Sequence, residues 1–383
     1  MKLKISELGK VITGNTPSKK IKEFWDKDDV GFVKPDIISD EHIVKIKSED
    51  CNEFISNAAI SKARIVPKNS IFVTCIGNIG KIGVATENLA FNQQINAIIP
   101  NENVNLDYLC YAIFANKTRL QDIANAPIVP LLNKSQFSEF ELEFDMDINT
   151  QTRIVHELNT VSNIILKYKQ ELLLLDELVR ARFVEMFGDP NIEFKYSSVK
   201  FNDLVARMTK GPFGSDMKKD LFVPKGEDTY KVYIQINAIQ KNQSLGEYYI
   251  SKEYFDRKVS RFELFPNDYI ITCDGTLGKY LKLDENMEKG VISPSLLRLT
   301  LQNDKINDKY FENIWDFYML GLMKKEARNA CLVHLPSAKK IGEISIPVPP
   351  LELQNQFASF VEEIDKSRLL SNHSLLLIKS LIF

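Results

Sequence analysis

The chain has 383 residues, of which 44% are hydrophobic and 26% are charged, and its formal net charge is −2. This composition suits two or three globular units with hydrophobic cores and excludes a disordered or fibrous protein. No run of about 18 apolar residues could span a bilayer, and charges interrupt the apolar residues of Met1–Glu7, so we expect a cytoplasmic protein without membrane contact. The near-neutral charge argues mildly against a surface that only binds phosphates.

A first unit is expected over residues 1–147. Short runs of β-branched and aromatic residues alternate there with Gly and Pro turns, and one helix is predicted near Leu106–Asn125. This pattern is typical of an α+β domain.

A long helix is expected over residues 148–188, because residues 148–187 contain neither Gly nor Pro and carry a heptad seam of apolar residues. The seam consists of Ile154, Leu158, Val161, Ile165, Tyr168, Leu172, Leu175 and Val179. Gly188 and Pro190 then end the helix, since neither residue type continues one easily.

A second unit, expected over residues 189–346, repeats the first roughly 200 residues further along the chain. Both copies read T-C-x-G-x-[IL]-G-K, at Thr74–Lys81 and Thr272–Lys279. Further matches keep the same order: Gly14–Ser18 with Gly211–Ser215, Phe32–Ile38 with Tyr233–Ile239, and a second helix near Lys309–Asn329. Similarity that preserves order indicates a duplicated unit.

A second long helix is expected over residues 347–383, following the prolines of Pro347–Pro350. Its seam is Phe357, Val361, Ile364, Arg368, Ser371, Leu375, Ile378 and Ile382, which is apolar except at Arg368 and Ser371. We predict tandem duplicated α+β domains separated by long helices that pack on each other as an antiparallel coiled coil. The alternative is that each stripe packs on its own globular unit.

The sequence offers no catalytic site. The glycine motif has two residues between its glycines where a nucleotide P-loop needs four, and Ile82 or Tyr280 follows its lysine where a P-loop has Ser or Thr. No methyltransferase or nuclease pattern is complete, and the four histidines form no metal-binding pair. We therefore expect no enzyme activity, no cofactor and no metal. The five scattered cysteines, predicted to be buried thiols, are Cys51, Cys75, Cys110, Cys273 and Cys331.

Loops at matching positions of the two copies carry side chains suited to nucleic acid. Asn or Gln can pair with adenine and Arg or Lys with guanine, whereas phosphates need only positive charge or an N–H group. The candidate DNA-binding residues are Asn15, Thr16, Ser18, Lys19, Lys20, Lys34, Asp36, Asn78, Lys81, Gln93 and Gln94 in the first copy, and Lys210, Phe213, Ser215, Lys218, Lys219, Gln235, Asn237, Thr276 and Lys279 in the second. The motif glycines, Gly77, Gly80, Gly275 and Gly278, can equally be plain turn formers.

With these features the chain resembles the specificity subunit of type I restriction–modification enzymes. The resemblance rests on Gly14–Ser18 with Phe24-Trp25, on Gly211–Ser215, on both glycine motifs, and on Ile346–Glu352 leading to Gln354. It implies two target-recognition domains that each read one half of a split, asymmetric site in double-stranded DNA. It also implies helices that dock two methyltransferase (M) subunits, with motor–nuclease (R) subunits joining through the assembled complex.

Two departures from that family pattern concern the second helix, which stops at Phe383 and carries Arg368 and Ser371 in its seam. Either the final helix is short or a few terminal residues are absent. A different class of protein stays open as well: a non-catalytic adaptor that binds protein or RNA and dimerises through the coiled coil.

Overall fold

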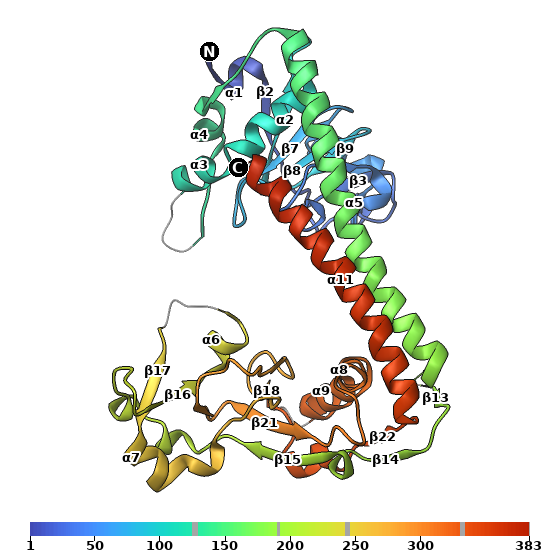
Figure 1. The fold of residues 1–383 in the computed structure, drawn as a ribbon. Coiled ribbons are helices and arrows are strands. Elements are labelled where there is room, and N and C mark those ends of the chain that lie inside the picture. Colours follow the sequence, from blue (N-terminus) through green and yellow to red (C-terminus); the bar gives the residue numbers. More distant parts are fainter. Residues whose placement is uncertain (125–128, 190–191, 242–245, 330–333, 383) are drawn as a thin grey trace. The chain divides into compact units, whose positions relative to one another are not determined.

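The computed structural model describes residues 1–124, 129–189, 192–241, 246–329 and 334–382. The chain divides into two compact units, Met1–Lys167 and Tyr168–Phe383, and the boundary lies within the long helix α5 (Ile148–Phe187). Figure 1 gives the order of the elements by colour. None of the helices in the described ranges has the length and apolar content needed to cross a membrane.

Unit 1 is built on a five-stranded sheet of order β2-β10-β7-β8-β4, a four-stranded sheet of order β5-β3-β9-β6, and the pair β1-β11. Its strands are β1 (Lys2–Lys4), β2 (Gly9–Thr13), β3 (Val30–Val33), β4 (Val44–Ile46), β5 (Phe54–Ile55), β6 (Ile65–Val66), β7 (Ile71–Thr74), β8 (Ile82–Ala85), β9 (Leu89–Phe91), β10 (Ile95–Pro100) and β11 (Glu141–Glu143). Its helices before α5 are α1 (Ile5–Leu8), α2 (Leu106–Ala115), α3 (Lys117–Ile123) and α4 (Lys134–Glu139).

Strand β7 shows why these residues form a central strand. All four of its residues are buried, and side chains alternate between the two faces of a strand. Ile71 and Val73 pack in one cluster with Leu109 of α2, whereas Phe72 packs in another with Phe91 of β9. A continuous apolar run is therefore buried on both sides.

Unit 2 repeats this topology. Its sheets have the orders β15-β21-β18-β19, β17-β16-β20 and β14-β22, which correspond to β2-β10-β7-β8, β5-β3-β9 and β1-β11 of unit 1. The strands are β12 (Gly188–Asp189), β13 (Glu193–Phe194), β14 (Ser198–Lys200), β15 (Val205–Lys210), β16 (Thr229–Tyr233), β17 (Tyr248–Ser251), β18 (Tyr269–Thr272), β19 (Tyr280–Lys282), β20 (Gly290–Ile292), β21 (Leu296–Leu301) and β22 (Ser345–Pro347). The helices are α6 (Gln235–Ala238), α7 (Lys252–Tyr254), α8 (Asp308–Ile314), α9 (Leu320–Asn329), α10 (Ala338–Gly342) and α11 (Leu351–Ile382). The predicted duplication of an α+β unit is confirmed.

The single helix predicted in each unit is divided. Near Leu106–Asn125 the chain forms α2 and α3, with Asn116 between them and its Nδ2 donating to Ala112 O (2.8 Å); Asn125 lies outside the described residues. In unit 2, α8 and α9 are joined by the π-helical turn Trp315–Met319. Trp315 is fully buried and its Nε1 donates to Gly278 O (2.9 Å), so this turn is anchored to the glycine motif.

The two long helices run antiparallel within unit 2, as predicted. The rings of Phe183 in α5 and Phe357 in α11 are 5.6 Å apart, while further along Arg368 of α11 reaches Asp176 of α5 (2.6 Å). Residue numbers thus rise along one helix as they fall along the other (Figure 1). Helix α5 ends where Gly188 takes a φ of 93°, a conformation that glycine adopts without a Cβ clash.

The polar residues of the second seam have partners on the opposite helix. Arg368 bridges Asp176 of α5 (2.6 Å) and Asp365 of α11 (2.8 Å), and the Ser371 hydroxyl lies 3.2 Å from the carboxylate of Glu171. A polar residue in a seam finds its hydrogen-bond partners in one helix register only, so these contacts fix the register of α11 against α5.

The cysteines behave as buried thiols where they are described. Cys51, Cys75, Cys110 and Cys273 are all buried and free, and burial raises the pKa of Cys75 to about 12. Cys331 lies outside the described residues.

Candidate nucleic-acid interface

Four loops of unit 1 meet where strands of its two sheets end. They are residues 14–20 after β2, residues 34–37 after β3, the β7–β8 turn at 76–81, and the β9–β10 connection at 92–94, and we call them loop surface 1. Backbone hydrogen bonds hold the other three beside the last, from Gly14 N to Ile95 O (3.1 Å), from Asn92 N to Val33 O (3.2 Å), and from Cys75 N to Gln94 O (2.8 Å). The predicted residues of the first copy are therefore brought together.

Loop surface 2 is the corresponding region of unit 2: residues 211–219, 234–240, 274–279 and 293–295. Equivalent backbone hydrogen bonds hold it, from Gly211 N to Leu296 O (2.9 Å), from Ser293 N to Tyr233 O (3.0 Å), and from Cys273 N to Ser295 O (2.9 Å). Both surfaces rest on the same backbone framework.

The first glycine of each surface is required by close backbone approach. A Cβ added to Gly14 would lie 2.0 Å from Asn92 O, and one added to Gly211 would lie 2.0 Å from Ser293 O. Each loop can cross its neighbour only without a side chain at this position.

The glycine motif is a structural turn, which supports the turn-forming interpretation. Thr74 Oγ1 donates to Asn78 O (2.6 Å) and accepts from Lys81 N (3.0 Å), and Thr272 makes the same two bonds in unit 2. Gly77 and Gly80 have φ values of 76° and 86°, which favour glycine. The threonine and the glycines thus shape the turn.

Side chains within loop surface 1 contact one another. Thr16 Oγ1 donates to Gln93 Oε1 (2.7 Å), which links the first loop to the fourth. Lys81 Nζ donates to Pro35 O (3.2 Å), which links the turn to the segment after β3. Gln94 accepts from the Asn92 side chain (2.9 Å) and is turned toward its own loop.

The lysines at one side of loop surface 1 are paired with acids. Lys19 and Lys34 both contact the carboxylate of Glu53, and the Lys19 ammonium lies 5.1 Å from the ring centre of Trp25. Asp36 accepts from Asn52 Nδ2 (3.2 Å). Ser18 and Lys20 are exposed at the tip of the first loop.

In loop surface 2 an amide cluster surrounds one hydroxyl. The side chains of Gln235 and Gln240 both donate to Thr276 Oγ1, at 2.9 and 3.2 Å. The Asn237 side chain donates instead to Gly246 O. Gln235 and Thr276 are thus joined as a unit, and Asn237 is turned away from them.

The structural correspondence after β3 and β16 differs by one residue from the sequence alignment. Val33 pairs with Phe91 and Tyr233 with Ile292, so Val33 corresponds to Tyr233. Lys34 therefore corresponds to Ile234. The sequence pattern pairs Phe32 with Tyr233, since both residues are aromatic.

The remaining predicted residues of unit 2 are exposed. The Phe213 side chain is 76% exposed, although large aromatic residues are usually buried. Lys210, Ser215, Lys218 and Lys219, which are near Phe213 in sequence, are exposed, and so is Lys279 in the glycine motif.

Sequence reasoning missed three residues that shape these surfaces. Glu53 and Gln240 contact predicted residues directly. The hydrogen bond from Lys117, with a smaller contribution from Asn78, lowers the pKa of the Asp40 carboxyl. Gln240 follows a predicted segment and could have been included with it. The two acids carry no local signal, because their partners are distant in sequence.

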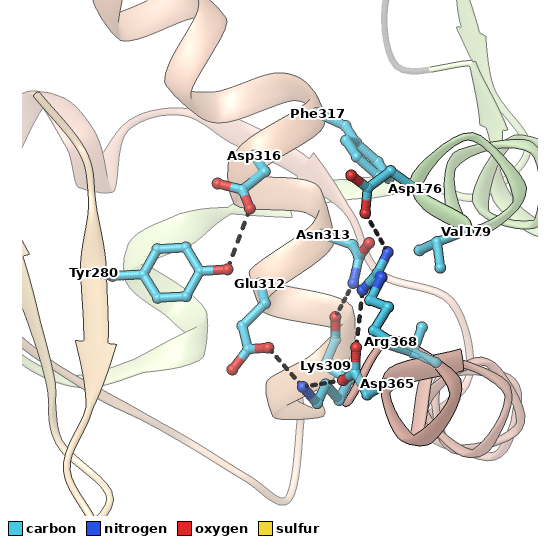
Figure 2. Close-up of a pocket in the computed structure, with 11 residues that line it drawn as sticks. Asp176, Val179, Tyr280, Lys309, Glu312, Asn313, Asp316, Phe317, Asp365 and Arg368 are labelled. Atoms are coloured by element: carbon cyan, nitrogen blue, oxygen red, sulfur yellow. Dashed lines mark hydrogen bonds and ion pairs between the residues drawn. The ribbon is translucent and has the colours of Figure 1, made fainter. Parts of the chain in front are cut away.

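A pocket of about 380 Å³ in unit 2 lies between α8, α5 and α11 (Figure 2). Lys309 of α8 reaches Asp365 of α11 (2.9 Å) and Glu312 (3.2 Å), and Arg368 also contacts Asp365. Burial raises the pKa of Asp316, which accepts from the Tyr280 hydroxyl (3.2 Å). The charges in this pocket pair with one another, so we interpret it as a structural junction between the sheet domain and the helices.

Two copies of one scaffold, with polar loops at the same strand ends and different side chains on those loops, define a protein with two related loop surfaces. Residues 1–174 and 214–379 match the family described as type I restriction modification DNA specificity domain. The chain belongs to this family.

Curated relatives and solved structures are consistent with that assignment. The chain is 30% identical over 203 residues to the type I restriction enzyme MjaIX specificity subunit of Methanocaldococcus jannaschii, covering 51% of this chain and 46% of the relative. It is 34% identical over 142 residues to the HindI specificity subunit of Haemophilus influenzae, covering 36% and 30%. These matches span less than half the length of either relative.

Two solved structures share the fold. The S subunit of a type I restriction–modification system from M. genitalium aligns with a TM-score of 0.54 at 14% identity, over 100% of this chain and 93% of that one. A chain from a structure of type I R-M complex assembly and conformational transition aligns with a TM-score of 0.56 at 12% identity, over 100% and 95%.

Proposed function

We propose that this chain is the DNA sequence-recognition subunit of a type I restriction–modification complex and is not itself an enzyme. Loop surface 1 reads one half of a split, asymmetric DNA site and loop surface 2 reads the other. The observation that carries this proposal is that the same strand ends in both units hold loops with a shared backbone framework and different side chains. Two readers of different sequences on one scaffold need that combination.

The side chains of both surfaces fit base reading. Gln235 offers an amide that can pair with the adenine edge, and Lys34 offers an ammonium that can bind guanine O6 or N7. Exposed lysines such as Lys218 and Lys219 suit phosphates. We propose DNA contact for all the candidate residues predicted above, with Gln240 added to the group around Thr276.

The long helices are proposed to dock two methyltransferase subunits, with motor–nuclease subunits joining through the assembled complex. Helix α5 exposes Leu173 (65%) and Leu174 (54%), and α11 exposes Leu369 (70%) and Leu370 (71%). Such apolar groups on a helix surface are typical of protein interaction sites. The proposed domain bounds are 1–147 and 189–346 for the target-recognition domains and 148–188 and 347–383 for the helices.

Salt-dependent binding to duplex DNA tests the recognition proposal. The full chain, with its methyltransferase subunits, should bind duplex DNA with an affinity that falls as salt rises, because lysines on phosphates release counterions. Binding to single-stranded RNA or to protein alone, without duplex binding, would contradict the proposal and favour the adaptor.

A further inference from the structure

Two lysines of loop surface 1 share one acidic partner. The Lys34 ammonium donates to Glu53 Oε1, and the Lys19 ammonium lies 3.1 Å from Glu53 Oε2. The Glu53 side chain is 27% exposed, so one face of the carboxylate still meets solvent. A single negative charge therefore neutralises part of the cationic charge that this surface could offer to DNA.

The position of Glu53 is fixed by the sheet. Its backbone carbonyl accepts from Phe32 N (2.9 Å), directly before β5 pairs with β3. Partial burial alone would raise the pKa of Glu53, but hydrogen bonds from Lys34 and Lys19 outweigh it and hold the pKa below its ordinary value. The carboxylate is thus charged at neutral pH and held in place beside both lysines.

The cations of unit 2 are arranged differently. Lys210, Lys218, Lys219 and Lys279 are exposed, and within the described ranges none of them forms an ion pair. The nearby Asp216 pairs with Lys258 instead (3.4 Å). Unit 2 can therefore place several free ammonium groups on phosphates.

We propose that Glu53 is a specificity-determining residue of loop surface 1, an inference that rests on the proposed DNA-reading function. Its carboxylate holds Lys19 and Lys34 so that they do not bind phosphates of any sequence. An ammonium has three donors, so Lys34 keeps donors for a guanine edge while one bonds Glu53. DNA without a guanine at this position brings its negative charge toward Glu53 and gains no hydrogen bond from Lys34 in return. Such DNA should therefore bind more weakly.

The two loop surfaces would then contribute differently to DNA binding. Unit 2 supplies affinity that does not depend on sequence, through its free lysines. Unit 1 contributes less of that affinity and discriminates more strongly between sequences.

The test replaces Glu53→Gln in the full chain bound to its methyltransferase subunits. Glutamine keeps the size of the side chain and removes the charge, so Lys19 and Lys34 become free to contact phosphate. Binding to a random-sequence duplex is measured by fluorescence anisotropy across a series of KCl concentrations. We expect tighter binding than wild type and a salt slope that steepens by up to about 2, since each phosphate contact adds about 0.9.

Glu139→Gln is the matched control, because it removes the same charge from the same unit. Glu139 pairs with Lys4 (2.5 Å) before the start of β2, whereas loop surface 1 follows the end of that strand. The triple variant K19Q/K34Q/E53Q should lose the affinity that Glu53→Gln gains. Equal salt slopes and affinities for Glu53→Gln and Glu139→Gln would overturn the proposal.

Two further outcomes keep the test decisive. Lys34→Gln alone should leave the salt slope for random-sequence DNA unchanged, because Glu53 prevents Lys34 from binding phosphate. A shallower slope would overturn the inference. This variant therefore tests the proposal even if Glu53→Gln fails to fold. If the wild-type complex shows no salt-dependent duplex binding at all, the recognition function itself is wrong and this inference falls with it.

Discussion

The buried glutamine at the start of α11 should control the stability of unit 2. Gln354 is fully buried; its Oε1 accepts from Asn307 N (2.8 Å), and its Nε2 donates to Pro349 O (2.8 Å) and Lys305 O (3.3 Å). It joins the long helix to the cap of α8. Gln354→Ala leaves the partly buried Asn307 N–H without its acceptor, which costs up to about 1–3 kcal/mol, and the two carbonyls and the cavity add to this.

We expect Gln354→Ala to lower the unfolding free energy of unit 2 by about 2–4 kcal/mol. With a urea slope of about 3 kcal/mol/M, the transition midpoint should fall by about 1 M. The chain has two tryptophans, Trp25 in unit 1 and Trp315 in unit 2. In a Trp25→Phe background, emission of the buried Trp315 therefore reports the unfolding of unit 2 alone.

The chain supplies two controls for this measurement. Gln356→Ala changes an exposed glutamine on the same helix and should leave the midpoint unchanged. Gln151 makes the equivalent bond in unit 1, accepting from Asn105 N (2.8 Å). In a chain that retains Trp25, Gln151→Ala should therefore lower the unit 1 transition that Trp25 emission reports. If Gln354→Ala shifts the Trp315 transition no more than Gln356→Ala does, the argument about the buried hydrogen bonds is refuted.

Three other predictions concern DNA, partners and the helix seam. Phe213→Ala should weaken binding to the cognate duplex without changing the salt slope, because an aromatic ring releases no counterions. It should change the unfolding free energy by less than about 0.5 kcal/mol, and a shallower salt slope would contradict the prediction. Leu370→Glu should reduce methyltransferase-subunit binding at least tenfold in calorimetry while unit 2 keeps its midpoint, and unchanged binding would argue against docking on this face. Arg368→Leu should destabilise unit 2 by about 1 kcal/mol, because Asp176 and Asp365 lose their shared partner. Adding Asp176→Leu should restore part of that stability by removing one of the two carboxylates that have lost Arg368, as urea titration will test.

The sequence predicted the repeated elements because their signals are local. The heptads of α5 and α11, the glycine motif and the α+β character follow from spacing within short segments. Asn116 divided one predicted helix because its side chain bonds back to Ala112 O, an alternative that a periodic pattern does not reveal. The heptad spacing identifies Arg368 as a polar residue of the seam, but its partner Asp176 follows only from the antiparallel packing.

The composition of the candidate interface was harder to predict. The four loops of each unit are predictable because they recur in both copies, and the structure brings them together. Glu53 was missed because its partners Lys19 and Lys34 lie far from it in sequence and meet it only after β5 pairs with β3. The one-residue shift between Lys34 and Gln235 has a similar cause, since strand pairing and not residue type fixes the correspondence.

The central claim is that each unit reads its own half of a split site. Mapping methylated positions in the genomic DNA of cells carrying the intact system tests it most directly, with wild type compared to Lys34→Ala and Gln235→Ala. We expect an asymmetric sequence in two parts separated by a fixed spacer, with Lys34→Ala relaxing one part and Gln235→Ala the other. A single continuous site, or equal relaxation of both parts by either variant, would contradict the account.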